Sequence, residues 1–238
     1  MIEPEVRKIV EEGSGNMISF AQRLIQLPSV TGEEGAVADL ILSEMKKLDY
    51  DKVYRDEAGN VVGVISGTGD GEHLLYNCHM DQVDIGDRAS WLHDPFGGEV
   101  VDGVVWGRGA SDTKGAMAVQ IHALGRLKKF NIPLSGDVFM VCVVQEETGS
   151  WGTKFLLDHF KTDLAVLGEA TTNQVANGHR GRTEILIEFT GSSVHAAAAD
   201  QSINPLYMLS SFLMEIPRLP VLLNPILGKN SISPTRCY

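Results

Sequence analysis

The sequence predicts an α/β protein in which a mainly parallel sheet is flanked by helices. Up to about residue 170, strand-like apolar runs alternate with segments whose apolar residues follow helical spacing. The strand-like runs are rich in Val and Leu, which is typical of parallel strands that are buried on both faces. From about residue 182 this pattern changes, so we place a boundary near residue 180, between domains 1–180 and 181–238.

Local patterns define the expected elements of the first domain. A helix is predicted within 32–50, with Thr31 or Gly32 near its start as the cap, because its apolar residues recur at helical spacing. A hairpin is expected over 98–109, with its turn at Asp102 and Gly103. The other expected elements are strands at 60–65, 74–78, 137–144 and 163–169, and helices at 113–129 and 151–160.

The second domain is expected to contain both strand and helix. Apolar and polar residues alternate over 183–191, which predicts a strand with one exposed face. The segment 204–217 is predicted to be a helix that begins at Asn204 and Pro205.

Composition and charge limit the possible functions. The 238-residue chain has a formal net charge of −11, whereas a nucleic-acid surface needs concentrated Lys and Arg, so we expect small-molecule partners and no nucleic acid. The longest apolar run, 138–144, is much shorter than the about 20 residues that span a bilayer, so we expect no membrane partner. Segment 1–13 lacks a signal-peptide pattern, and Cys78, Cys142 and Cys237 form no CxxC pair. We therefore expect buried thiols and a reducing, cytoplasmic location.

Polar residues cluster where the predicted strands end. In an open α/β sheet, ligands bind outside the carboxyl ends of the strands, so these side chains are expected to converge. Each residue alone has an ordinary alternative, as a helix cap, a solvated strand end or a surface acid. Together, converging carboxylates repel one another unless a cation neutralises them. The clustered residues are His79, Asp81, Asp112, Glu146, Glu147 and Glu169.

The residue types indicate which metal fits. One imidazole with several carboxylates suits zinc, and also cobalt or manganese. A carboxylate can bridge two ions about 3.5 to 4 Å apart, as in many hydrolases. Of two adjacent glutamates, one can bind metal while the other stays free as a general base.

Four motifs, in order, resemble one known family. They are HMD at 79–81, GRGASDTKG at 107–115, EETGSWG at 146–152 and GEAT at 168–171. The chain resembles the acetylornithine deacetylase, succinyl-diaminopimelate desuccinylase and glutamate carboxypeptidase family of di-zinc amidohydrolases. The resemblance implies a zinc-aminopeptidase-like catalytic domain, followed by an α+β lid or dimerisation domain. The GEAT and GHRGR segments are also similar to the selenium-metabolism-linked hydrolase branch.

The resemblance assigns a role to each clustered residue. His79 and Glu169 would bind the first zinc, Glu147 the second, and Asp112 would bridge both ions. Asp81 would hold the His79 ring. Glu146 would take a proton from the water between the metals, and this water would then cleave a small amide. The typical substrate would be an N-acyl amino acid or a dipeptide-like compound with a free carboxylate. A non-proline cis peptide is implied after Asp112.

The resemblance also extends into the second domain. The segment TGSSVHAAAA at 190–199 is similar to the family's lid motif, whose histidine helps to stabilise the oxyanion. His195 would fill this role and would imply a homodimer through the lid. Without the resemblance, a histidine packed against small residues at a helix start is the simpler interpretation.

The chain departs from the family in two respects, and three other functions are weighed against the hydrolase. Family members are longer and supply a late histidine to the second zinc, whereas none of the seven histidines here follows His195. We therefore expect a chain that stops within the lid, and the alternative function is a truncated, catalytically impaired metal-binding remnant. Nucleotide binding at SGTGDGEH or WGRGASDTKG is disfavoured because neither segment is a P-loop. Serine hydrolysis lacks a G-x-S-x-G segment.

Overall fold

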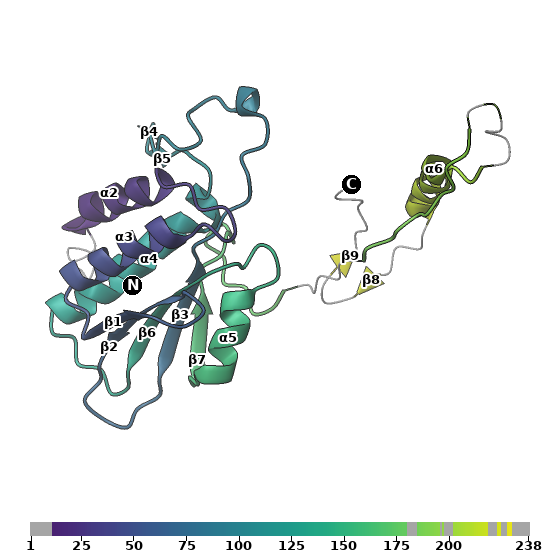
Figure 1. Cartoon of the computed structure of the whole chain (residues 1–238). Helices are drawn as coiled ribbons and strands as arrows, with labels where there is room; N and C mark the ends of the chain where they lie inside the picture. Colours follow the sequence, from purple (N-terminus) through teal and green to yellow (C-terminus); the bar gives the residue numbers. More distant parts are fainter. Residues whose placement is uncertain are drawn as a thin grey trace. The chain divides into compact units, whose positions relative to one another are not determined.

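The computed structural model describes residues 11–179, 185–195, 197, 202–218, 223–224 and 228–229 (Figure 1). The chain divides into two compact units, Met1–Asn173 and Gln174–Tyr238. The first unit carries the sheet and all the acidic residues of the predicted metal cluster.

A five-stranded mixed sheet forms the centre of the first unit. Its strand order is β1-β2-β6-β3-β7. Strand β3 pairs in parallel with both β6 and β7, while β1 and β2 extend the sheet through antiparallel pairs. The carboxyl ends of β3, β6 and β7 therefore share one edge of the sheet, where ligands of α/β proteins gather. The strands are β1 (Lys52–Arg55), β2 (Val61–Ile65), β3 (Leu74–His79), β6 (Val138–Val143) and β7 (Leu164–Leu167).

Helices pack on both faces of this sheet, which confirms the predicted α/β class. Successive side chains of a strand point to opposite faces, and β2 shows both sides of the core. Val61 and Ile65 belong to the cluster that includes residues of α2 (Ser14–Ile25), α3 (Gly35–Lys47) and α4 (Gly115–Lys129). Val62 and Val64 pack with Leu156 of α5 (Trp151–His159) in the other cluster. The all-buried strand β2 is thus explained by two covered faces.

The expected elements are mostly present, with two additions and one correction. The sequence analysis made no prediction for α2 or β1. The hairpin is confirmed as β4 (Val100–Val101) and β5 (Val104–Val105), and Asp102 and Gly103 both have the positive φ that a two-residue turn favours. The predicted cap of α3 is wrong, because the N-cap residue is Glu34, which makes no side-chain cap bond. The Thr31 hydroxyl, which was expected near the helix start, donates to Asp81.

The second unit contains the predicted helix but not the predicted strand in its described part. Helix α6 (Pro205–Glu215) begins as expected, with Asn204 Oδ1 accepting a hydrogen bond from the Leu206 N–H at 2.9 Å. It continues into the 3₁₀ turn η4 (Ile216–Arg218), and β8 (Leu223–Asn224) pairs with β9 (Gly228–Lys229). The strand predicted at 183–191 is wrong over 185–191, because no described strand pairs with this segment; Ile185 and Leu186 are 75% and 76% exposed. Residues 183–184 lie outside the described part.

The two cysteines that the structure describes agree with the expectation of buried thiols. Cys78 and Cys142 are buried, free and opposite each other on β3 and β6, while Cys237 lies outside the described residues. Within the described ranges, no helix has both the length and the apolar character needed to cross a membrane.

Candidate metal centre

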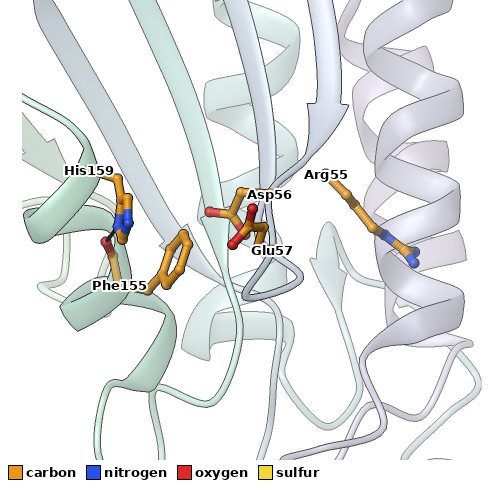
Figure 2. Close-up of a pocket in the computed structure, with 5 residues that line it drawn as sticks. All are labelled: Arg55, Asp56, Glu57, Phe155 and His159. Atoms are coloured by element: carbon orange, nitrogen blue, oxygen red, sulfur yellow. Dashed lines mark hydrogen bonds between the residues drawn. The ribbon is translucent and has the colours of Figure 1, made fainter.

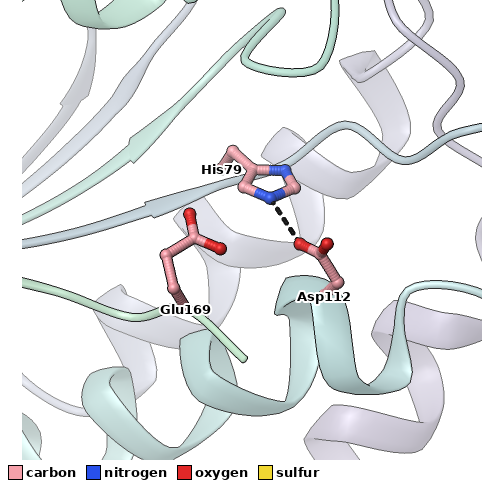
Figure 3. Close-up of side chains that lie close together, drawn as sticks. All are labelled: His79, Asp112 and Glu169. Carbon is pink, nitrogen blue, oxygen red and sulfur yellow. Dashed lines mark hydrogen bonds and ion pairs between the residues drawn. The ribbon is translucent and has the colours of Figure 1, made fainter. Parts of the chain in front are cut away.

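Three residues from separate segments meet at the carboxyl edge of the sheet (Figure 3). His79 is the last residue of β3, and Glu169 follows β7. Asp112 lies in the kinked turn η2 (Ala110–Lys114) before α4, where its own φ and ψ are not helical. One ligand atom from each of these three side chains lies within 4.8 Å of the other two. The structure therefore brings together three of the four predicted metal ligands. The histidine is buried and both carboxylates are exposed, so the cluster is open on its acidic side.

The His79 ring is fixed through both nitrogens. Its Nδ1–H donates to the backbone carbonyl of Asp81 at 2.9 Å, and its Nε2 faces Asp112 Oδ1 at 2.8 Å. Burial by itself lowers the pKa of this imidazole, but the contacts with Asp112 and Asp81 reverse the effect and raise the pKa to about 10. The His79 contact in turn holds the pKa of Asp112 below its ordinary value. The ring nitrogen Nε2 thus points at the carboxylates with which it would share a cation.

The acids of the cluster repel one another. Burial raises the pKa of Glu169, and the carboxylates of Asp112, Glu146 and Glu147 raise it further against the opposite effect of His79. Burial and the Asp112 charge likewise raise the pKa of Glu147. This electrostatic strain, together with an imidazole and several carboxylate oxygens, fits a divalent cation.

Asp81 has a larger task than the sequence indicated. Its side chain is 1% exposed, and Oδ1 lies 3.4 Å from His79 Nδ1. The carboxylate accepts hydrogen bonds from the backbone N–H of Glu146 at 2.9 Å and of Glu147 at 3.0 Å, and from the Thr31 hydroxyl at 2.8 Å. Asp81 therefore joins the end of β3 to the turn that carries both glutamates. Burial alone raises the pKa of Asp81, but the His79 ring and these hydrogen bonds together hold it below its ordinary value.

The Asp112 and Glu169 segments are also joined directly. The peptide between Asp112 and Thr113 is cis, which confirms the bond implied by the resemblance. The buried Thr113 hydroxyl donates to the carbonyl of Gly168, the residue before Glu169. A Cβ atom at Gly168 would lie 2.4 Å from Cys78 Sγ, so only glycine lets the end of β7 approach this closely.

The remaining predicted residues occupy two different places. Glu146 and Glu147 lie half-buried in the turn after β6, and their charges act on Glu169. His195 is an exposed residue of the second unit, and its Nδ1 accepts a hydrogen bond from the Ala197 N–H at 3.2 Å. The catalytic roles of Glu146 and His195 stay predictions.

Several buried or partly buried polar residues around the centre were not predicted from the sequence. Thr31 contacts Asp81, Glu34 contacts Gln145, and the Lys114 Nζ donates to Gln82 Oε1 at 2.6 Å. A buried acid or lysine is unusual, but burial is not visible in a sequence. The one usable signal was the polar SVTGEE segment between two helices, at 29–34.

A hollow elsewhere on the first unit has no comparable chemistry (Figure 2). Its volume is about 400 Å³, and its lining is Arg55, Asp56, Glu57, Phe155 and His159. Arg55 donates to the carbonyl of Gly35 and to Asp39, and His159 stacks on Phe155. These groups are occupied with structural contacts, so the metal cluster remains the candidate site.

The fold and the residue cluster together indicate a class of protein. A histidine and two acids that meet at the carboxyl edge of an α/β sheet are typical of metal-binding α/β proteins. Comparison with known families then specifies the class: the profile of Peptidase family M20/M25/M40 matches residues 75–203. The chain belongs to this family.

Individual relatives give the same assignment. The uncharacterised protein YgeY of Escherichia coli (strain K12) is 32% identical over 236 residues, which cover 93% of this chain and 58% of YgeY. Succinyl-diaminopimelate desuccinylase of Rhodospirillum centenum is 31% identical over 220 residues, covering 86% of this chain and 57% of that enzyme. This chain therefore spans less than two thirds of the length of these curated relatives.

Solved structures support the fold. The di-peptidase Dug1p of Saccharomyces cerevisiae has a TM-score of 0.68 at 14% identity, over 88% of this chain and 51% of Dug1p. Human carnosine dipeptidase 1 has a TM-score of 0.61 at 19% identity, over 68% of this chain and 40% of that protein. At these identities, the likeness concerns the fold alone.

Proposed function

We propose that this chain provides the metal centre of an amidohydrolase that cleaves a small amide carrying a free carboxylate. The observation that carries the proposal is the meeting of His79, Asp112 and Glu169 next to a turn with two glutamates. The relative named succinyl-diaminopimelate desuccinylase supports an amide bond as the target, and we propose N-acyl amino acids or dipeptide-like compounds as the substrate class.

The proposed cofactor is a pair of zinc ions, for which cobalt or manganese can substitute. His79 Nε2 and Glu169 would hold the first ion, Glu147 the second, and Asp112 both, in keeping with the preference of zinc for nitrogen and carboxylate oxygen. When bound, such ions supply a Lewis acid that polarises an amide carbonyl and makes water more acidic.

Glu146 is the proposed general base. Its backbone N–H is held by Asp81, and its half-buried carboxylate lies among the cluster acids. Glu146 removes a proton from the attacking water, and the oxygen of that water forms a bond to the amide carbon. The same carboxyl group then returns the proton to the leaving nitrogen as the C–N bond breaks. The products are a carboxylic acid and an amine.

The second unit is proposed to supply the lid. His195 would stabilise the oxyanion, and the lid would join two copies of the chain as a cytoplasmic homodimer. Light scattering coupled to size-exclusion chromatography tests the dimer. A metal-binding remnant without catalysis is the second candidate, and it is favoured because, among the described residues, Glu147 does not join the cluster of His79, Asp112 and Glu169.

Metal analysis combined with an amide-cleavage panel separates the two candidates. We expect about two ions per chain and hydrolysis of some N-acyl amino acid after zinc or cobalt is added. Glu146→Gln should keep the metal content and abolish hydrolysis, because the variant loses the base but no metal ligand. One ion or none, without turnover, would support the remnant. Loss of metal in Glu146→Gln would contradict the role of Glu146.

A further inference from the structure

The segment Ser29–Glu34, between α2 and α3, runs along the strand end that carries His79. The Ser29 hydroxyl donates to the Met80 carbonyl at 2.8 Å, and the Gln82 N–H donates to the Ser29 carbonyl at 2.9 Å. Val30 also forms a parallel bridge with Gln82. This segment therefore extends the carboxyl edge of the sheet next to the metal centre.

Glu34 is the last residue of this segment, and its side chain is turned inward. It is 5% exposed, and its Oε1 accepts hydrogen bonds from the Gly32 N–H at 3.0 Å and the Gln145 N–H at 3.1 Å. Its position at the N-cap of the 13-residue helix α3 suits a carboxylate, because the helix dipole favours negative charge there. The contact with Gln145 links residues far apart in sequence.

Gln145 is the residue directly before the two glutamates. It has a positive φ of 54°, a conformation that residues other than glycine rarely adopt. Such a residue persists where its surroundings fix it. Glu34 fixes the N–H of Gln145, while Asp81 accepts the N–H groups of Glu146 and Glu147. Three consecutive backbone N–H groups of this turn are thus held by two buried carboxylates.

We propose that Glu34 is a positioning residue that fixes the turn from which Glu146 and Glu147 reach the metal centre. Glu34 acts through Gln145 and does not belong to the metal cluster. The consequence for catalysis rests on the proposed function: a general base displaced by about 1 Å can lose a factor on the order of 100 in rate. The hold on the turn itself does not depend on catalysis.

Two substitutions at Glu34 and one at its neighbour test this role. Glu34→Ala removes the acceptor, whereas Glu34→Gln keeps an acceptor oxygen, because both hydrogen bonds go to the single atom Oε1. Glu33→Ala is the matched control, since Glu33 is an exposed acid one residue away. All three variants are made in the full 238-residue chain, and their folding is checked by circular dichroism.

Hydrogen–deuterium exchange of the peptide that contains Gln145 gives a measurement independent of activity. We expect exchange at this turn to speed up by about tenfold in Glu34→Ala, while Glu34→Gln and Glu33→Ala exchange like the wild type. In the active enzyme, Glu34→Ala should lower kcat by about 10- to 100-fold with little change in KM. The glutamine variant should recover most of kcat.

The outcomes separate this inference from the proposed function. Unchanged exchange in Glu34→Ala, or equal losses in Glu34→Ala and Glu34→Gln, would overturn the positioning role. Exchange that speeds up equally over the whole first unit would also overturn it, because it reports general unfolding. Faster exchange in Glu34→Ala that is confined to the turn would support the role of Glu34, whether or not the protein is a hydrolase. If the wild-type protein then cleaves no amide, the hydrolase is refuted while the role of Glu34 stands.

Discussion

The hydrogen bonds of Asp81 lead to a quantitative prediction for Asp81→Asn. If Asp81 only oriented His79, asparagine would be a mild change, because an amide oxygen can still accept a hydrogen bond from the ring. In the structure, however, Oδ1 accepts from the Glu146 N–H and Oδ2 from the Glu147 N–H. Asparagine has one acceptor oxygen, so either orientation of its amide directs an NH₂ group at a backbone N–H.

The magnitude follows from burial and from the number of contacts. Asp81 is 1% exposed, so the backbone N–H that loses its partner stays buried and costs about 1–3 kcal/mol. Loss of the negative charge also weakens the contact with the His79 ring 3.4 Å away. We expect the free energy of unfolding to fall by about 2–4 kcal/mol in total. Thr31→Val removes one neutral donor and leaves both backbone pairs intact, so it should cost only about 1 kcal/mol.

Urea unfolding followed by circular dichroism measures both variants against the wild type, and metal content is determined on the same samples. Asp81→Asn should be the more destabilised variant and should lose metal, because the turn with Glu147 is released. A change of less than about 0.5 kcal/mol in Asp81→Asn, or a smaller loss than in Thr31→Val, would refute the assignment of both N–H groups to this carboxylate.

Two further predictions concern Glu44 and Lys114, two charged residues that are not predicted metal ligands. Burial raises the pKa of Glu44, but the hydrogen bond and charge of Arg23 outweigh burial and lower the pKa. Ionised Glu44 therefore stabilises the fold above its unfolded pKa near 4.5. This stabilisation is lost as the pH falls through the lower pKa of the folded state. Glu44→Gln should therefore be less stable than the wild type at pH 7, with a difference that shrinks in urea titrations as the pH falls below 4.5. Lys114→Met should lower the free energy of unfolding by about 2–4 kcal/mol. The buried Lys114 Nζ donates to Gln82 Oε1 and to the Leu27 carbonyl, and both acceptors would lose this donor. Thermal unfolding measures this loss, and an unchanged melting temperature would contradict it.

The sequence predicted the parts of the centre that depend on side-chain type and strand position. His79, Asp112 and Glu169 each follow or precede an apolar element, and the parallel order of β3 and β7 brings their ends together. The contacts of Asp81 could not be predicted, because its partners are backbone N–H groups, which every residue except proline carries. Helix α2 was missed although Phe20 and Leu24 follow helical spacing, and the strand expected at 183–191 was predicted from alternation alone, without a partner strand.

The buried and exposed acids of the centre behave as two groups with different tasks. Asp81 and Glu34 are buried, and both oxygens of Asp81 and the Oε1 of Glu34 accept hydrogen bonds from backbone N–H groups, which fixes the geometry. Asp112 and Glu169 are exposed at the open side. A carboxylate that already accepts several N–H groups has little capacity left for a cation, whereas the exposed pair keeps its oxygens available. Burial and hydrogen-bond partners, rather than residue type, therefore decide which acids support the metal centre and which ones can bind the metal.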